Sequence, residues 1–219
     1  MVAGFTRIPL VTFNSSKAET FSPGDFLTRL EAVALVQTLN GEILASHSAT
    51  LTLEKWCQEH GLAGTGEAKI IARLSAAVPK PPTAEQRHRL GIGLEAEVKH
   101  RHVQLVCGEQ ILSEADNWYV ANRLTAEMNR VLEATATPFG KVVMDLKPYR
   151  QSFAVNVLWW PLPKGWENQP LPSSGNPMTL EIPDVIFEHR AVLYTNGLPF
   201  SEVHERYRRQ LLSFPWPHP

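Results

Sequence analysis

The sequence predicts a single α+β domain, built from one antiparallel β-sheet with helices packed on one face. Long β-prone stretches cover residues 97–107, 111–120 and 150–160, and tight turns separate several of the strands. Helical periodicity is strongest in the first quarter of the chain and returns once between strands. Strands joined by tight turns, with helices grouped apart from them, are typical of this class. A length of 219 residues, 43% of them hydrophobic, suits one sizeable core.

Two amphipathic helices are predicted early in the chain. The first begins at Asp25, a candidate N-cap, and its apolar residues recur at i, i+3, i+4 and i+7 until Asn40-Gly41 ends it. The second is capped by Thr50 or Thr52 and stopped by Gly61. Shorter helices are expected at 83–90 and 125–134, the latter with Thr125 as its cap.

Turn residues indicate how the strands connect. Gly108-Glu109-Gln110 is a tight connection, so 97–107 and 111–120 form an antiparallel hairpin. A short strand is expected at 69–74 and a longer one at 185–194, which ends in the hairpin turn Thr195-Asn196-Gly197. Residues 199–213 fit a returning strand, a helix, or one followed by the other.

Two segments lack regular structure in this interpretation. Residues 1–24 are an irregular leader, and the domain spans 25–219. The loop at 161–183 contains six prolines and cannot be a helix or a central strand. Trp166 and Leu171 could anchor it as a lid over a pocket or an adjoining interface, and its composition would equally suit a disordered tether.

Charge and cysteine content limit the function classes. The formal net charge of −1 gives no global positive field, so neither nucleic acid nor an anionic membrane surface is expected as a partner. Cys57 and Cys107 are too few for a disulfide framework, which favours a reducing cytoplasm. Neither a signal peptide nor a membrane-spanning run is present in the sequence, so a soluble cytoplasmic protein is expected.

Arg101 is the most informative residue of the chain. In a strand, it shares a face with Val103, Leu105 and Cys107, so the arginine continues an apolar face. A buried guanidinium needs an anion, from the protein or from a ligand. The alternatives are an internal salt bridge or a position at the solvated end of the strand.

The other candidates are more often structural. His100 and His102 alternate with Arg101 and lack a third metal ligand, so solvated strand histidines are expected and a metal site is not. Glu114 and Asp116 fit surface charges. Trp159-Trp160 fits one core residue and one interface residue.

The order of four motifs resembles the chorismate lyase family, whose fold is shared with the ligand-sensing domains of some bacterial transcription regulators. The motifs span roughly residues 45–210. They are Thr50-Leu51-Thr52 before a short helix, Arg101-His102-Val103-Gln104-Leu105, Leu124-Thr125-Ala126-Glu127-Met128 to Thr137-Pro138-Phe139-Gly140, and Tyr149-Arg150-Gln151-Ser152-Phe153.

The resemblance implies a buried pocket in which Arg101 and backbone amides hold the carboxylate of chorismate or 4-hydroxybenzoate. Phe139 matches the residue whose turn offers an amide, and Leu51 matches the flap. A glutamate on the last hairpin completes the family's site; counting without a gap lands on His204, which Glu202 and Glu205 flank. Glu114 occupies the region where the family has a small glycine against the substrate ring.

These matches imply a cofactor-free lyase that eliminates pyruvate from chorismate or a related enolpyruvyl or aromatic acid. Arg101 would orient the carboxylate, and Glu202 or Glu205 would protonate the departing ether oxygen. The alternative is a non-catalytic sensor that binds a small carboxylate in the same pocket. A third reading is a scaffold that docks through Trp159-Trp160 and Trp166. The sequence does not determine the oligomeric state.

Overall fold

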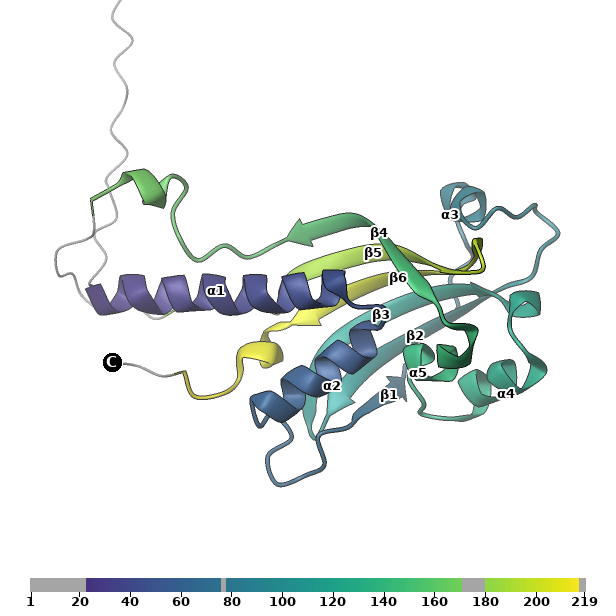
Figure 1. Ribbon diagram of the computed structural model, residues 1–219, viewed down its shortest axis with the longest axis horizontal. Helices are drawn as coiled ribbons and strands as arrows, with labels where there is room; N and C mark the ends of the chain where they lie inside the picture. The colour runs from purple at the N-terminus through teal and green to yellow at the C-terminus, as the bar shows by residue number, and fades with distance from the viewer. Residues whose placement is uncertain (1–22, 76–77, 171–179, 217–219) are drawn as a thin grey trace, which may run out of the picture.

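The structure, a computed structural model, describes residues 23–75, 78–170 and 180–216 (Figure 1). Six strands form one sheet in the order β1-β2-β3-β6-β5-β4, and each neighbouring pair is antiparallel. The predicted α+β fold class is therefore confirmed. The strands are β1 (Ile70–Leu74), β2 (Val98–Cys107), β3 (Gln110–Val120), β4 (Tyr149–Val157), β5 (Val185–Thr195) and β6 (Leu198–Arg208).

Helices α1 (Pro23–Ala45) and α2 (Ala49–Glu59) cross in front of the sheet in Figure 1, and α4 (Ala126–Ala134) and α5 (Phe139–Val142) lie at one end of it. The six-residue α3 (Ala84–Arg89) is the exception to the one-sided packing, since it lies near the turn end of β5 and β6 (Figure 1). Within the described residues, no helix is long and apolar enough to cross a membrane. Short 3-10 turns complete the fold: η1 (Ala121–Arg123), η2 (Met144–Leu146), η3 (Trp166–Asn168) and η4 (Arg209–Leu212).

The core lies between the helices and one face of the sheet, in two clusters. The first joins α1 and α2 to the strands through residues that include Leu39, Leu53 and Leu105. The second joins α4 and α5 to the other end of the sheet, and Leu132 and Phe200 are among its most buried members. The apolar residues of the strands alternate toward this face, as the sequence pattern predicted.

Helix starts follow the capping rules at α3 and α4, but the caps predicted for the first two helices are wrong. Helix α1 begins at Pro23, a residue favoured in the first turn of a helix, so Asp25 lies inside the helix rather than at its N-cap. Thr125 accepts a hydrogen bond from the amide of Met128 and caps α4, as predicted. Helix α2 is capped by Ser48, which accepts from the amide of Leu51, rather than by Thr50 or Thr52. All three hydroxyl residues could serve as a cap, and the burial of Thr50 and Thr52 inside the helix leaves Ser48 at its start.

Helix α1 continues through Asn40-Gly41, where the sequence predicted its end. A glycine inside a helix costs about 1 kcal/mol. Two contacts on either side of it offset that cost: Asn40 bonds Nε2 of buried His189 at 2.7 Å, and Ile43 is fully buried in the core. Tertiary packing therefore overrides the local stop signal.

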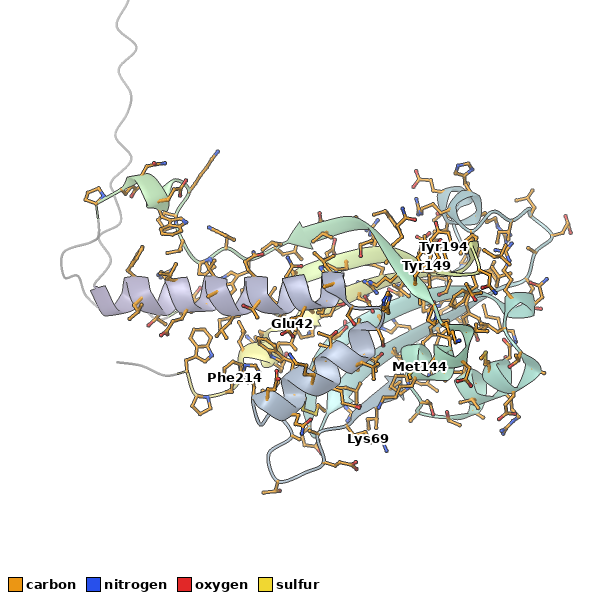
Figure 2. All side chains as sticks on the ribbon, viewed as in Figure 1. Glu42, Lys69, Met144, Tyr149, Tyr194 and Phe214 are labelled. Carbon is orange, nitrogen blue, oxygen red and sulfur yellow. A yellow bond between two sulfur atoms is a disulfide. The ribbon has the colours of Figure 1, made fainter. Side chains whose placement is uncertain are left out.

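The C-terminal part combines two of the alternatives for residues 199–213. Strand β6 is followed by the 3-10 turn η4. The predicted hairpin turn is present, with φ of 50° at Asn196 and 78° at Gly197. At the β4 and β5 ends beside this turn, the rings of Tyr149 and Tyr194 stack 5.0 Å apart (Figure 2).

The described part of the proline-rich loop packs on α1 and does not line the cavity described below. Trp166 lies 5.9 Å from the ring of Phe26, and Arg29 donates to the carbonyl of Pro161 at 2.8 Å. Leu171, the other expected anchor, lies outside the described residues. Residues 161–170 therefore pack against α1, a contact that the lid hypothesis did not include. Trp159 is buried in the core, as expected for one residue of this pair, and Trp160 is half-exposed; the expected interface role stays a prediction.

A disulfide between Cys57 and Cys107 ties α2 to β2. The sequence spacing gives no sign of this bond, because 50 residues separate the two cysteines and only the packing of α2 on the sheet brings them together. The bond removes the argument for a reducing compartment that was based on cysteine usage. It also couples the helix whose N-terminus lines the cavity to the strand that carries Arg101.

Reduction of this disulfide is expected to destabilise the fold by about 2–4 kcal/mol, because the crosslink restricts the unfolded chain. Urea unfolding with and without dithiothreitol measures the effect. The Cys57→Ser/Cys107→Ser double variant serves as the control and should unfold at one urea concentration in both buffers. Superimposable wild-type curves would contradict the prediction.

Candidate functional site

A cavity lies between the sheet and the N-terminus of α2. Helix α5 and the first residues of β4 close its sides. Its volume is about 50 Å³, enough for a few water-sized molecules. Most of the lining is apolar: Ala49, Val103, Leu105, Ala115, Phe139, Val143, Pro148, Leu193 and Val203. The polar lining residues are His47, Ser48, Thr50, Arg101, Asn117, Arg150 and Glu205. An apolar cavity with a few convergent polar groups is typical of a small-molecule site.

Arg101 lies on the cavity face of β2 and is only 6% exposed. One guanidinium nitrogen, Nη2, donates to the carbonyls of Thr135 and Thr137 at 3.3 and 3.1 Å. The other two nitrogens, Nε and Nη1, are buried and have no hydrogen-bond partner among the described residues. The predicted inward arginine is therefore present, and it has neither the internal salt bridge nor the solvated position that were its alternatives.

Electrostatics distinguish Arg101 from the second arginine of the cavity. Burial lowers the pKa of Arg101 from its ordinary value, because no carboxylate compensates the loss of water. Burial also disfavours the charge of Arg150, but nearby Glu205 outweighs this effect and raises the pKa of Arg150. The cavity thus holds one paired guanidinium and one unpaired guanidinium.

Glu205 contributes the only carboxylate among the residues that line this cavity. Its Oε2 lies 2.6 Å from Nη2 of Arg150 in an ion pair, and it accepts a hydrogen bond from the hydroxyl of Tyr207 at 3.0 Å. Tyr207 is fully buried, and burial raises the pKa of its phenol well above the ordinary value, so it remains a donor. These contacts fix the carboxylate against the cavity wall.

Strand alternation separates the two glutamates that the sequence left open. Positions 202 and 205 are three residues apart, an odd number, so their side chains leave β6 on opposite faces. Glu202 binds Nε and Nη2 of Arg89 at 2.8 and 2.9 Å on the face away from the cavity. His204 shares that outer face and contacts Glu188 at 2.9 Å. Of the three hairpin candidates, the structure brings only Glu205 together with Arg101.

Glu114 is also on the outer face, where it accepts from Gln104 at 3.1 Å and lies 3.6 Å from Arg208. It cannot repolarise the cavity, because its neighbour Ala115 is the residue of β3 that faces inward there. Asn117, one further alternation along the strand, is the next inward position.

Of the two other residues that the resemblance assigns to the pocket, Phe139 lines the cavity and Leu51 does not. Leu51 is 42% exposed and does not line the cavity, whereas Ser48, Ala49 and Thr50 beside it do. Phe139 lines the cavity and packs against Tyr119 with ring centres 5.6 Å apart. The N-terminus of α2 and the turn that contains Phe139 approach each other closely at Gly140, where a Cβ would lie 3.0 Å from Oγ of Ser48. The binding roles of Arg101, Phe139 and Glu205 stay predictions.

The outer face carries a polar cluster around Asp116, which the sequence analysis took for a surface charge. Asp116 is 2% exposed. His100 and His102 contact its Oδ1 at 2.9 Å, Lys80 donates at 3.0 Å, and Arg206 donates to Oδ2 at 2.9 Å. The two histidines are thus hydrogen-bond partners of a buried carboxylate rather than solvated residues. Within the described ranges, no group of three or more His, Cys, Asp and Glu side chains could hold a metal ion.

A second cavity, of about 220 Å³, lies beside Arg101 at the end of β2. It is more open and more polar than the first, and its lining includes His100, His102 and Glu133. Each cavity is lined by one carboxylate that is already paired: Glu133 with Lys99 in the second, and Glu205 with Arg150 in the first. The first cavity is preferred as the ligand site because it is more enclosed and mostly apolar, so a charged contact to Arg101 would be stronger there.

Among the polar lining residues on the strands, Arg150 and Asn117 were missed as site residues by sequence reasoning. Arg150 was noted only as part of a motif, because the positions that alternate with it, Ser152, Ala154 and Asn156, do not form an apolar face that would single it out. Asn117 was passed over because it follows two acidic residues in what looked like a polar stretch. Counted from the hairpin turn, the period of two would have placed Asp116 opposite Arg101; the β-bulge between Leu105 and Val106 shifts the register so that Asn117 takes that position.

Comparisons with known proteins were made on sequence and on structure. No family model matches the chain. Among solved structures, the effector domain of PhnF from Mycobacterium smegmatis has a TM-score of 0.45 and 12% identity over 74% of this chain and 89% of that one. A GntR-family transcriptional regulator from Enterococcus faecalis has a TM-score of 0.42 and 14% identity over 67% and 99%. For the possible transcriptional regulator YydK from Bacillus subtilis, the TM-score is 0.41 with 15% identity over 68% and 61%. At these scores the likeness is partial, and no functional argument is drawn from it.

A curated relative is much more similar in sequence. It is the uncharacterized protein y4mC of Sinorhizobium fredii, which is 42% identical over 221 residues. The match covers 99% of this chain and 92% of the relative. Identity of this extent over nearly the full length of both chains implies one shared fold. The chain therefore belongs to the same family as the y4mC protein of Sinorhizobium fredii.

Proposed function

We propose that this protein binds a small organic carboxylate in the cavity at Arg101 and acts as a non-catalytic binding or sensor protein. One observation carries the proposal: Arg101 is buried, lines an apolar cavity, and has two guanidinium nitrogens without a partner. Nε and Nη1 lie on different edges of the guanidinium, so each can give a carboxylate oxygen a single charge-assisted hydrogen bond, while Nη2 already donates to Thr135 and Thr137.

The energetics favour a missing anion over a merely structural role. An uncompensated buried charge costs several kcal/mol, and a carboxylate placed against it would recover much of that cost. Arg150 also has two buried nitrogens, Nε and Nη2, without a geometrically satisfactory hydrogen bond, but its charge is compensated by the ion pair with Glu205 at 2.6 Å. Arg101 has no such carboxylate among the described residues. The residue that lacks a partner is the one that a ligand would complete.

A second candidate function is the elimination of pyruvate from chorismate or a related enolpyruvyl acid. The presence of Glu205 in the same cavity as Arg101 favours it, because such a reaction needs a carboxyl group that protonates the departing ether oxygen. One observation weighs against it. Glu205 is already held by Arg150 at 2.6 Å and by the hydroxyl of Tyr207, so its carboxylate is engaged within the protein rather than directed at a ligand. The volume of about 50 Å³ does not separate the two functions, because the cavity would have to widen for a benzoate as well as for chorismate.

The test is to titrate the purified protein with acetate, propionate, lactate, benzoate and 4-hydroxybenzoate by calorimetry, and to incubate it with chorismate while following pyruvate. Binding of an acid without pyruvate release supports the sensor. Pyruvate release at enzyme-like rates would replace the sensor by the lyase. Absence of binding by every acid would reject the carboxylate site.

Glu205→Gln separates the two functions further. In a binding protein, loss of this carboxylate leaves the cavity more positive, so acids should bind as tightly as to wild type or up to about tenfold more tightly. In a lyase, the same change should remove turnover. Glu202→Gln is the matched control, since Glu202 lies on the outer face and should leave acid affinity unchanged. Weaker acid binding by Glu205→Gln would contradict the expectation.

A further inference from the structure

The cavity holds a second unpartnered donor beside Arg101. Asn117 lines the cavity, is 4% exposed, and its Nδ2 is buried without a hydrogen-bond partner among the described residues. Its other amide atom, Oδ1, accepts from the hydroxyl of fully buried Ser201, which fixes the orientation of the amide. The free N–H group of Asn117 is therefore held in place.

The sheet register places Asn117 directly opposite Arg101. The two residues pair across β2 and β3, and both side chains are on the cavity face. Residues opposite each other in an antiparallel pair have Cβ atoms roughly 4.5–5.5 Å apart. One small ligand can therefore contact both side chains at once.

The charges of the lining limit the ligand further. Arg101 and Arg150 contribute two positive charges and Glu205 one negative charge, and the ion pair occupies Arg150. One cation thus remains free among the described charged lining residues. A monocarboxylate would neutralise it, whereas a second carboxylate would lie in an apolar cavity without a free cation.

We propose that Asn117 determines which acid this cavity accepts, by donating to a neutral oxygen next to the carboxylate that Arg101 holds. The preferred ligand class is a monocarboxylate with a hydroxyl, carbonyl or ether oxygen close to the carboxylate. This inference rests on the proposed function, and it names a residue and a ligand class that the function alone does not require. A buried amide donor left unpaired by an unsubstituted acid penalises that acid.

The experiment compares acids that differ by one hydroxyl: propionate with lactate, and benzoate with 2-hydroxybenzoate. In calorimetry, the wild-type protein should bind the hydroxy acid of the tighter-binding pair roughly tenfold more tightly than its parent. Asn117→Leu should reduce this ratio to about one while retaining the parent acid. Succinate and phthalate should bind more weakly than propionate and benzoate.

Ser113→Ala is the matched control, because Ser113 is a fully buried residue of β3 whose Oγ also lacks a partner but which does not line the cavity. It should leave the ratio unchanged. Asn117→Asp guards against a leucine variant that fails to fold: it gives Arg101 a carboxylate partner, so it should fold and lose binding of all acids by more than about tenfold.

The outcomes distinguish a failure of this inference from a failure of the proposed carboxylate-binding function on which it rests. An unchanged hydroxyl ratio in Asn117→Leu, or full acid affinity in Asn117→Asp, would overturn the role of Asn117 while acid binding through Arg101 stands. Tighter binding of the dicarboxylates would overturn the ligand class. If no acid binds the wild-type protein, or if Arg101 does not matter for binding, the proposed function fails and this inference with it.

Discussion

Arg101→Met is expected to abolish measurable acid binding while the protein stays folded. Loss of a buried charged contact costs roughly 2–5 kcal/mol of binding, which corresponds to about 30-fold to several thousand-fold in Kd. Methionine has a similar length and no charge, so the cavity wall keeps its packing. Calorimetry with the tightest-binding acid of the wild-type protein measures the loss.

A second readout of the same variant separates a ligand site from a structural arginine. Replacement of Arg101 removes a buried charge that has no anion, and this gain opposes the loss of its hydrogen bonds to the carbonyls of Thr135 and Thr137, so the melting temperature should change little. Replacement of an arginine that stabilises the fold would lower it. A melting temperature several degrees lower, with acid affinity intact, would show that Arg101 is structural.

Arg123→Met is the matched control for binding. Arg123 is also partly buried, and it donates to the carbonyls of Leu90, Gly91 and Pro199, with a pKa lowered by burial. It does not line the cavity. The control should therefore lose stability but keep wild-type acid affinity, which is the reverse of the pattern expected for Arg101→Met.

Asp116→Asn is expected to produce the largest loss of stability, about 3–5 kcal/mol. The carboxylate of Asp116 is buried and receives contacts from Lys80, His100, His102 and Arg206 at 2.9–3.1 Å. The backbone amide of Lys80 donates to Nδ1 of His100 at 3.1 Å, which leaves the Nε2 hydrogen for the carboxylate. An amide cannot accept from all these donors, so several buried polar groups lose their partner. Urea unfolding at neutral pH measures the change.

The same carboxylate predicts how stability depends on pH. Burial would raise the pKa of Asp116, but the hydrogen bonds from Lys80, His100 and His102 outweigh it and hold the pKa far below its ordinary value. A lowered folded-state pKa stabilises the protein above the unfolded-state value of about 3.9, and the contribution disappears as the pH falls toward the folded-state pKa. The stability difference between wild type and Asp116→Asn should therefore be present above about pH 5 and should shrink below about pH 4.

Asp184→Asn is the control for both measurements. Asp184 lies 3.4 Å from Arg209, and both side chains are more than half exposed, so the pair should contribute less than about 1 kcal/mol. A small effect at Asp184 with a large effect at Asp116 attributes the loss to the buried cluster. Equal small losses at both positions would contradict the role assigned to Asp116.

Local sequence signals predicted most elements because their causes are local. Thr125 caps its helix through a bond within one turn, and Asn196-Gly197 forms its hairpin because both residues adopt positive φ. The end of α1 was predicted wrongly because its cause is not local. The contacts that carry the helix past Gly41 come from His189 and the core, far away in the chain.

The candidate site shows the same division between features with local causes and features that depend on contacts far apart in the chain. Strand alternation in the sequence alone determined that Arg101 continues an apolar face, and it also contained the separation of Glu202 from Glu205, since their spacing is odd. Only the tertiary structure decided that Arg101 lacks a carboxylate partner, that Arg150 neutralises Glu205, and that Asn117 lies opposite Arg101. These facts depend on which strands become neighbours, and pairing between segments far apart in the chain follows from the packing of the whole sheet rather than from any local preference.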